Sequence, residues 1–318
     1  MRRVVLATLG CISLSVPAAP PNAPPNAGAH ATTTVEAPAI GSASALAAKQ
    51  PRDGKPVSRR TIAPGIEELV FADGSTYRGS LRGGVPHGHG AYSCPLFTYE
   101  GDFDAGRKQG LGTYRWPNGD RYEGRFVNDQ PDGHGRYEFA SGDTYEGEVR
   151  HGTISGHGRY RTAGGDEFEG DFALGRPEGR GTLRFANGDR YVGEVHGGTM
   201  DGYGRYQTRG GDRIDARFAH GRPQGVGTIA YANGDVYEGE IIDGAATGRG
   251  VVRYAGGSRY DGEVRQGRPQ GQGTLSWPDG SRFEGRFDGG LAHAEGLLVR
   301  DGTRARARLD GGVVTTLE

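Results

Sequence analysis

The amino-acid sequence predicts an all-β fold built from repeated β-hairpins, and three observations support this. Glycine makes up 60 of the 318 residues, against roughly 7% in ordinary proteins, and so much glycine argues against a conventional core because glycine has no side chain to bury. The 15 tyrosines, 11 phenylalanines and 2 tryptophans are too many aromatic residues for a disordered chain. The glycine spacing also lacks the three-residue period of collagen. What remains is a regular fold that needs glycine at fixed positions, which indicates a repeat.

A 23-residue period organises the chain from residue 77 onward. Segments of the form aromatic-x-Gly-x-aliphatic or aromatic recur with one spacing of 22 residues and then spacings of 23. The ten segments begin at Tyr77, Tyr99, Tyr122, Tyr145, Phe168, Tyr191, Ile214, Tyr237, Tyr260 and Phe283. A degenerate eleventh copy follows at residues 305–309.

Glycine occupies fixed offsets within each unit, namely the second, seventh, eleventh and thirteenth residues after the first aromatic residue. The exceptions at the second and seventh offsets are Ala216 and Asp129. A turn closes most units, as in the Asn-Gly-Asp triplets at residues 118–120, 187–189 and 233–235, and Asn-Gly predicts a hairpin turn of type I′. Each unit is therefore predicted to form two strands, which in the second unit are residues 99–103 and about 111–116.

Alternation along these strands predicts one aromatic face and one polar face. The aromatic face of the second unit carries Tyr99, Gly101, Phe103, Gly110, Gly112, Tyr114 and Trp116. The polar face carries Glu100, Asp102, Thr113 and Arg115. An aromatic ring can lie over the glycine of a neighbouring strand, so we expect a ladder of rings seated on glycines.

The net charge of -1 conceals an asymmetry. Residues 1–65 carry seven basic and two acidic side chains, a charge of +5, which leaves -6 for the remainder. The repeats are therefore mildly acidic, which argues against a nucleic-acid-binding protein. The two cysteines, Cys11 and Cys94, are too few for a disulfide framework.

The N-terminal residues have the pattern of an export signal. Arg2 and Arg3 precede a mostly apolar stretch over residues 4–16, and small residues follow, which predicts a signal peptide over 1–19 with cleavage near Ala18. Lipid attachment at Cys11 is disfavoured because the preceding leucine is one place too close. Residues 20–64 are rich in Ala, Pro, Ser and Thr and are predicted to be a disordered linker. With 35 Arg against 3 Lys, we interpret the chain as an exported protein of a bacterial periplasm or cell envelope.

The 23-residue pattern resembles the MORN (membrane occupation and recognition nexus) repeat, whose signature is Tyr-x-Gly-x-aromatic with downstream Gly and Gly-x-Gly. The resemblance covers about residues 77–309. It departs at the fifth residue, where the family often has Trp and this chain has, for example, Phe103 or Val149. The resemblance implies an elongated, twisted single-layer antiparallel sheet of consecutive hairpins. On this interpretation the array spans 65–318, with a half-unit at 65–75 and a degenerate cap from about 303.

Candidate catalytic and metal-binding residues do not form convincing sites. His89, His134 and His157 share one repeat position, and successive units lie roughly 10 Å apart, too far for joint metal ligation. The recurring carboxylates, such as Glu123 and Glu146, share one kind of environment, whereas catalytic pairs need two. The Gly-x-Gly pairs lack the βαβ context of a nucleotide site. We therefore expect no enzyme activity, no cofactor, no metal and no small-molecule substrate.

The resemblance also implies scaffolding, homodimerisation and membrane-proximal organisation. The predicted function is therefore a scaffold of the cell envelope, with a protein partner and a homodimer as the expected assemblies. An uncovered apolar face marks an interaction surface, so the aromatic ladder is the candidate interaction face. Its residues are Tyr99, Phe103, Tyr114, Trp116, Tyr122, Phe126, Tyr145, Tyr160, Tyr191, Tyr237, Tyr260 and Trp277. A lipid-binding or cell-wall-glycan-binding module that uses the same face is the alternative function. A third alternative is that the rings pack against their own glycines and leave no binding face.

Overall fold

The computed structural model describes residues 54–317, which fold into strands without any helix. The predicted signal peptide and most of the predicted linker lie outside the described residues. The described residues contain no helix that could cross a membrane. Contacts divide them into an N-terminal unit, residues 54–199, and a C-terminal unit, residues 200–317.

The strands of the N-terminal unit are β1 Pro56–Ala63, β2 Ile66–Phe71, β3 Thr76–Arg82, β4 Val85–Cys94, β5 Phe97–Asp104, β6 Arg107–Arg115, β7 Arg121–Val127, β8 Gln130–Glu138, β9 Thr144–Arg150, β10 Thr153–Arg161, β11 Glu167–Ala173, β12 Arg176–Arg184 and β13 Arg190–His196. Those of the C-terminal unit are β14 Thr199–Gln207, β15 Arg213–Ala219, β16 Arg222–Ala230, β17 Val236–Ile242, β18 Ala245–Arg253, β19 Arg259–Arg265, β20 Arg268–Ser276, β21 Arg282–Asp288, β22 His293–Arg300, β23 Thr303–Asp310 and β24 Val313–Thr316.

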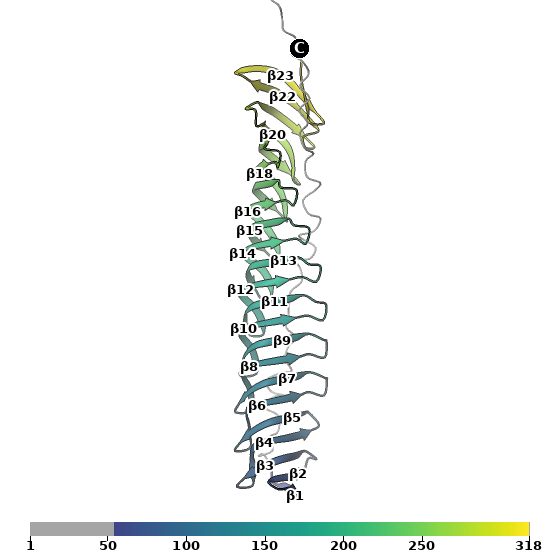
Figure 1. Ribbon diagram of the computed structural model, residues 1–318, viewed down its shortest axis with the longest axis vertical. Coiled ribbons are helices and arrows are strands. Elements are labelled where there is room, and N and C mark those ends of the chain that lie inside the picture. Colours follow the sequence, from purple (N-terminus) through teal and green to yellow (C-terminus); the bar gives the residue numbers. More distant parts are fainter. Residues whose placement is uncertain (1–53, 318) are drawn as a thin grey trace, which may run out of the picture. The chain divides into compact units, whose positions relative to one another are not determined.

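All 24 strands belong to one antiparallel sheet. Within each unit, every strand pairs with the next one along the chain, for example β5 with β6 and β6 with β7. The strands therefore follow one another as rungs in chain order, as Figure 1 shows. The predicted sheet of consecutive β-hairpins is confirmed.

The tight hairpin turn lies at a different place from the one predicted. In the second repeat, Ala105 and Gly106 both have positive φ, 47° and 81°, as a two-residue type I′ turn requires. This turn lets β6 begin at Arg107 rather than near residue 111. At the Asn118–Gly119 pair only the glycine has positive φ, 99°, so the type I′ prediction there is wrong. These residues form a longer turn, in which the backbone N–H of Trp116 donates to the backbone carbonyl of Asp120 at 2.9 Å.

The predicted linker is wrong at its C-terminal end, because residues 56–63 form the edge strand β1. This strand pairs with β2. Arg59 and Arg60 on β1 make ion pairs with Glu67 and Glu68 on β2, at 3.2 and 2.6 Å. The Ala/Pro-rich composition conceals this strand because its side chains are almost all exposed and give no apolar alternation.

A bulge in most repeats builds the seat of the aromatic ring, although the tenth repeat pairs in unbroken register. In the second repeat, Phe103 pairs with Lys108 and Gly101 with Gly112, so the register shifts between these pairs. The bulge contains Gly110, whose φ is 76°. A Cβ on Gly110 would lie 2.8 Å from the Asp102 carboxylate, on the polar face. The prediction that Gly110 lies on the aromatic face is therefore wrong, because a left-handed residue in a bulge breaks the alternation.

In the repeats that begin with tyrosine, the ring lies directly over glycine. A Cβ on Gly101 or Gly112 would lie 2.6 or 2.5 Å from the Tyr99 hydroxyl oxygen, so only glycine leaves room for the ring. The Tyr99 hydroxyl donates to the Asp102 carbonyl at the bulge, at 3.0 Å. The same hydrogen bond, from the tyrosine hydroxyl to the backbone carbonyl three residues later, is made by Tyr77, Tyr122, Tyr145, Tyr191, Tyr237 and Tyr260.

The rings also pack from one repeat to the next. The Tyr99 ring makes edge contacts with Phe103 of its own repeat and Phe126 of the following one, with centroids 5.1 and 5.0 Å apart. Such pairs add about 0.5–1.5 kcal/mol each beyond the burial of apolar surface. The core is therefore a row of rings held between glycines and neighbouring rings.

The longer turns are also linked in series. Asp120 accepts a hydrogen bond from the Ala140 N–H at 2.8 Å. Equivalent bonds join Asp143 to Ala163 and Asp166 to Ala186, and in the C-terminal unit Asp212 to Ala232 and Asp235 to Ala255. The aspartate at the end of each of these turns thus fixes the spacing of successive repeats.

Candidate functional site

The side chains of the aromatic ladder form the buried core of the protein. Twelve of the fifteen tyrosines are less than 2% exposed. Of the predicted interaction face, Trp116 is half-buried and the other eleven residues are buried. That these side chains contact a partner stays a prediction, and their burial favours the alternative in which the rings pack against their own glycines.

The surface that a partner can reach is the polar face, which is hollowed in the N-terminal unit. An open groove of about 730 Å³ crosses strands β4 to β9. Its floor is formed by the glycine pairs, including Gly101, Gly112, Gly124 and Gly135. We call this feature the glycine-floored groove. The floor is bare backbone because a Cβ on these glycines would point toward the tyrosine rings on the opposite face, so alternation leaves no side chain on that column of the polar face.

The two sides of the groove carry different side chains. One side carries His89, Leu111 and His134, which stand between the paired glycines of successive repeats. Leu111 is 69% exposed, which is unusual for a leucine in the middle of a strand. The opposite side carries Glu100, Thr113, Glu123, Arg136 and Glu146. The groove therefore combines an apolar side chain with a row of carboxylates.

The three carboxylates of the groove differ in whether they form ion pairs. Within the part of the chain that the structure describes, Glu100 and Glu146 make no ion pair, whereas Glu123 pairs with Arg121. Glu100 has Ala91 and Thr113 opposite it on the neighbouring strands, and Thr98 stands two places before it. Glu146 lies opposite Arg136 and Arg159, but these arginines pair with Glu138 and with Glu167 and Glu169 instead.

The C-terminal unit contains a smaller groove of about 450 Å³ at the equivalent place. Here arginine does precede the acidic residues. Arg259 lies 2.7 Å from the Asp261 carboxylate, and Arg282 lies 2.6 Å from that of Glu284. This second groove is therefore neutralised by its own side chains.

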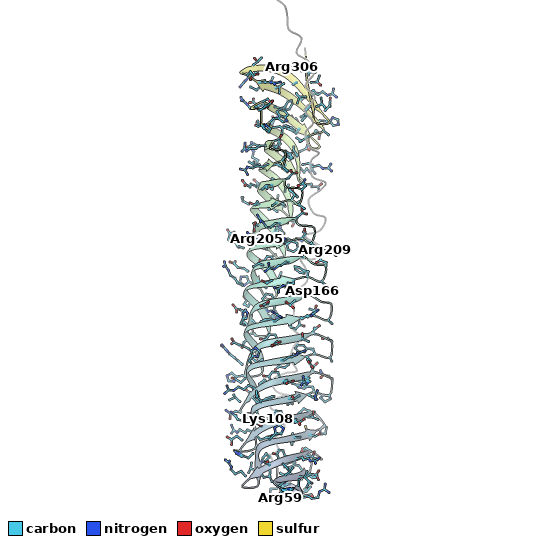
Figure 2. All side chains as sticks on the ribbon, viewed as in Figure 1. Arg59, Lys108, Asp166, Arg205, Arg209 and Arg306 are labelled. Atoms are coloured by element: carbon cyan, nitrogen blue, oxygen red, sulfur yellow. The ribbon has the colours of Figure 1, made fainter. Side chains whose placement is uncertain are left out.

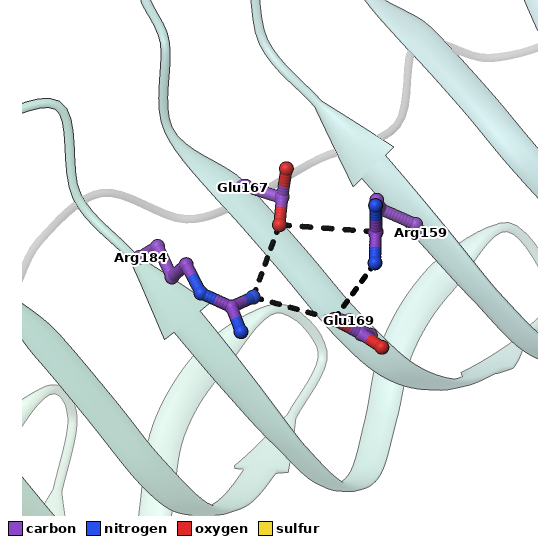
Figure 3. A network of polar contacts seen from close by, with 4 residues as sticks. All are labelled: Arg159, Glu167, Glu169 and Arg184. Carbon is purple, nitrogen blue, oxygen red and sulfur yellow. Dashed lines mark hydrogen bonds and ion pairs between the residues drawn. The ribbon is translucent and has the colours of Figure 1, made fainter.

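Between the two grooves in sequence, the polar face carries a closed charge network (Figure 3). Arg159 and Arg184 each contact Glu167 and Glu169 across β10, β11 and β12, at 3.0 to 3.8 Å. The hydrogen bond from Arg184 lowers the pKa of the Glu169 carboxyl. These carboxylates are already paired, which distinguishes them from Glu100 and Glu146.

The three repeat-position histidines lie on this exposed face, as predicted. The Nδ1 atoms of His89 and His157 lie 3.4 and 3.2 Å from the carboxylates of Asp102 and Asp171. Among the described residues, no group of three or more His, Cys, Asp or Glu side chains is placed to hold a metal ion.

The sequence pattern of the MORN repeat matches nine consecutive segments, which together cover more than half of the chain. They are residues 77–95, 99–121, 122–144, 145–167, 168–190, 191–213, 216–236, 237–259 and 260–282. The chain belongs to the MORN-repeat family. MORN repeats generally act as scaffolds for protein or membrane interactions. The predicted tenth unit lies outside the matched segments, but its Phe283 is buried and pairs with Leu298.

Comparison with curated proteins gives no match. Among solved structures, the TCP domain of SAS-4 from Drosophila melanogaster, in complex with a proline-rich motif of Ana2, is 13% identical, with a TM-score of 0.28 and coverage of 58% of this chain and 90% of that one. Virginiamycin B lyase from Staphylococcus aureus is 12% identical, with a TM-score of 0.14 and coverage of 82% and 99%. Similarities this weak carry no conclusion about the MORN protein.

Sequence reasoning missed one buried pair in the MORN array, Lys108 and Asp129. Lys108, labelled in Figure 2, is fully buried, and Asp129 is 6% exposed. The Lys108 ammonium lies 4.8 Å from the centroid of the Phe97 ring and 5.4 Å from that of Tyr114, within cation–π range. The Lys108 N–H donates to the Asp129 carboxylate at 2.8 Å, and the Asp129 N–H donates to the Lys108 carbonyl at 3.0 Å. The signal was visible in the sequence, since Asp129 interrupts the glycine pattern.

Burial of the ladder predicts a specific response to alkaline pH. Burial raises the pKa of Tyr77 to about 12. Burial, together with the nearby charges of Asp212 and Asp235, also raises the pKa of Tyr231 to about 12. The pKa of a tyrosine in an unfolded chain is near 10. A raised pKa means that the folded state holds its proton more tightly. We therefore expect the free energy of unfolding to be constant below about pH 9 and to fall as the pH rises from about 10 toward 12. Urea unfolding at several pH values, with absorbance at 295 nm to follow tyrosinate, measures this, and stability unchanged up to pH 12 would contradict it.

Proposed function

We propose that this MORN-repeat protein is a non-enzymatic scaffold of the cell envelope that binds another protein through the glycine-floored groove. The observation that carries the proposal is the contrast between the two faces: the aromatic ladder is buried, whereas the groove is open and holds an exposed leucine beside unpaired carboxylates. We therefore expect the partner to bind the polar face rather than the aromatic ladder. Burial of the ladder also weighs against the alternative of a lipid or glycan stacked on its rings.

Site-specific crosslinking in the cells that produce the protein tests the proposal. A photo-crosslinking amino acid replaces Leu111 in the groove, and in a matched variant it replaces Val226, which is 77% exposed at the same repeat position of the C-terminal unit. We expect a discrete protein adduct from position 111 and much less from position 226. The adduct should weaken when Glu100 and Glu146 are changed to glutamine. Equal labelling from both positions, or none from either, would contradict the groove as the binding surface.

Export to the cell envelope is the second part of the proposal. It is supported by Arg2 and Arg3, by the apolar residues 4–16 and by the small residues at 18 and 19. Cell fractionation with mass spectrometry of the mature N-terminus tests it. We expect an extracytoplasmic chain that begins near residue 19 or 20. A cytoplasmic chain that still carries its N-terminal residues would refute export. A mature chain that begins at a lipidated Cys11 would show lipid anchoring and refute cleavage near Ala18.

Self-association is the third part, and the edge strand β24 supports it. Among the described strands β24 pairs only with β23, so the other edge of its four residues is free to pair with a second copy. Light scattering should give the mass of a dimer for the wild type and of a monomer for Val314→Pro, because proline removes a backbone donor and is poorly tolerated in a paired strand. A monomeric wild type would refute the homodimer and leave the groove proposal standing.

A further inference from the structure

We infer that the glycine-floored groove takes a cationic segment in the polyproline II conformation, with Lys or Arg at every third residue. This rests on the proposed function, because it names the partner class of the same groove. Three features support it, namely the spacing of the repeats, the hydrogen bonding of the strands and the distribution of charge.

The spacing of the repeats matches this conformation. Equivalent side chains of successive repeats are two strands apart, which is about 9.6 Å when neighbouring strands are about 4.8 Å apart. A polyproline II helix has three residues per turn and rises about 3.1 Å per residue, so it advances about 9.3 Å per turn. Every third residue of such a segment would meet the next repeat, and the mismatch would reach only about 1 Å over three repeats. A β-strand repeats about every 6.7 Å and would lose register within one repeat.

The hydrogen bonding of the strands also favours this conformation. Strand β6 pairs with β5 on one side and with β7 on the other. The strands that form the floor therefore offer no free edge to which a peptide could add as a further strand. A polyproline II segment has no internal backbone hydrogen bonds and keeps its backbone solvated, so it does not need such an edge.

The charge of the groove favours a cationic segment. Glu100, Glu123 and Glu146 recur once per repeat along one side. Glu100 and Glu146 make no ion pair among the described residues, whereas Glu123 pairs with Arg121. The two arginines opposite Glu146 pair with other carboxylates. Lysine or arginine at every third residue would place one cation beside each of these carboxylates. Across the groove, Leu111 offers apolar surface to the intervening residues.

The C-terminal unit provides an internal comparison. Its groove is smaller, and its acidic residues Asp261 and Glu284 already pair with Arg259 and Arg282. The same segment would find no unpaired carboxylate there. The inference therefore assigns binding to the N-terminal groove alone.

Two peptides of identical composition test the inference on the full chain. The first, KPPKPPKPPK, has lysine at every third residue, and the second, KPKPKPKPPP, has lysine at every second. We expect the first to bind about tenfold more tightly by fluorescence anisotropy at physiological salt, since only it brings cations to all three repeats. Glu100→Gln with Glu146→Gln should remove this preference. Glu240→Gln with Glu295→Gln, which changes two exposed carboxylates of the C-terminal unit, should leave it intact.

Circular dichroism melts should show that both double variants remain folded. Equal affinity for the two peptides would mean that only unspecific charge attraction holds them, which would overturn the inference. The absence of binding would overturn it as well. Either result would leave the scaffold proposal standing as long as the adduct from position 111 persists. Loss of that adduct would instead remove the proposed function itself.

Discussion

Replacing Gly112 with alanine is expected to lower the free energy of unfolding by about 2–3 kcal/mol, because the added methyl group overpacks the core. Its Cβ would lie 2.5 Å from the hydroxyl oxygen and 2.6 Å from the Cε2 atom of Tyr99. The Tyr99 ring cannot move aside freely, since Phe103 and Phe126 hold it on two sides and its hydroxyl is bonded at the bulge. Urea unfolding followed by circular dichroism measures the change.

Gly164→Ala is the matched control for this substitution. Gly164 lies in a turn, and its added Cβ would approach the Thr162 hydroxyl only to 3.6 Å, an ordinary contact. We expect its effect to stay within about 0.5 kcal/mol. Equal effects of the two substitutions would mean that the tyrosine ring is not seated on Gly112 as described.

The pair formed by Lys108 and Asp129 is expected to behave as a unit. Five other repeats have proline at the Lys108 position, for example Pro131 and Pro177, and glycine at the Asp129 position, for example Gly152. Lys108→Pro alone would leave the buried Asp129 carboxylate without its 2.8 Å donor, and Asp129→Gly alone would leave the Lys108 N–H without that acceptor. Each single change should cost about 2–3 kcal/mol.

The double variant restores the arrangement of the other repeats, in which a glycine N–H donates to a proline carbonyl, as from Gly152 to Pro131 at 2.8 Å. It should therefore recover most of the lost stability. Asp129 also holds a φ of 75°, which glycine adopts without strain. A double-mutant cycle of urea unfolding measures the coupling, which we expect to be about 2 kcal/mol. Additive losses would show that the two residues act independently.

The sequence alone predicts most of the fold, because the features that define it are periodic. The rings over glycine and the separation of aromatic from polar side chains follow from the 23-residue spacing and from strand alternation. The tight turn at Ala105–Gly106 was not predicted, since alanine rarely adopts positive φ and Asn-Gly is the stronger turn signal. The bulge at Gly110 was not predicted either, because the alternation rule assumes regular strands. One residue with positive φ breaks this alternation and changes the face on which a residue lies.

The candidate site was harder to predict than the fold. Alternation correctly groups Tyr99, Phe103 and Tyr114, but it does not say whether a single layer closes over its own rings. That depends on the reach of the Tyr99 hydroxyl to the bulge carbonyl, which only the structure gives. The unpaired state of Glu100 follows from its uncharged neighbours Ala91, Thr98 and Thr113, a signal present in the sequence but meaningful only once the groove is known.

Nitration of the native full chain with tetranitromethane, followed by peptide mass spectrometry, tests most directly the central claim that the ladder is closed by its own rings. Tyr203 is 68% exposed, and every other tyrosine is at most 9% exposed. Tyr203 should therefore react first, while Tyr99, Tyr122 and Tyr145 stay unmodified until urea unfolds the chain. Nitration of these ladder tyrosines in the folded protein as fast as Tyr203 would contradict the account and return the aromatic face as an open binding surface.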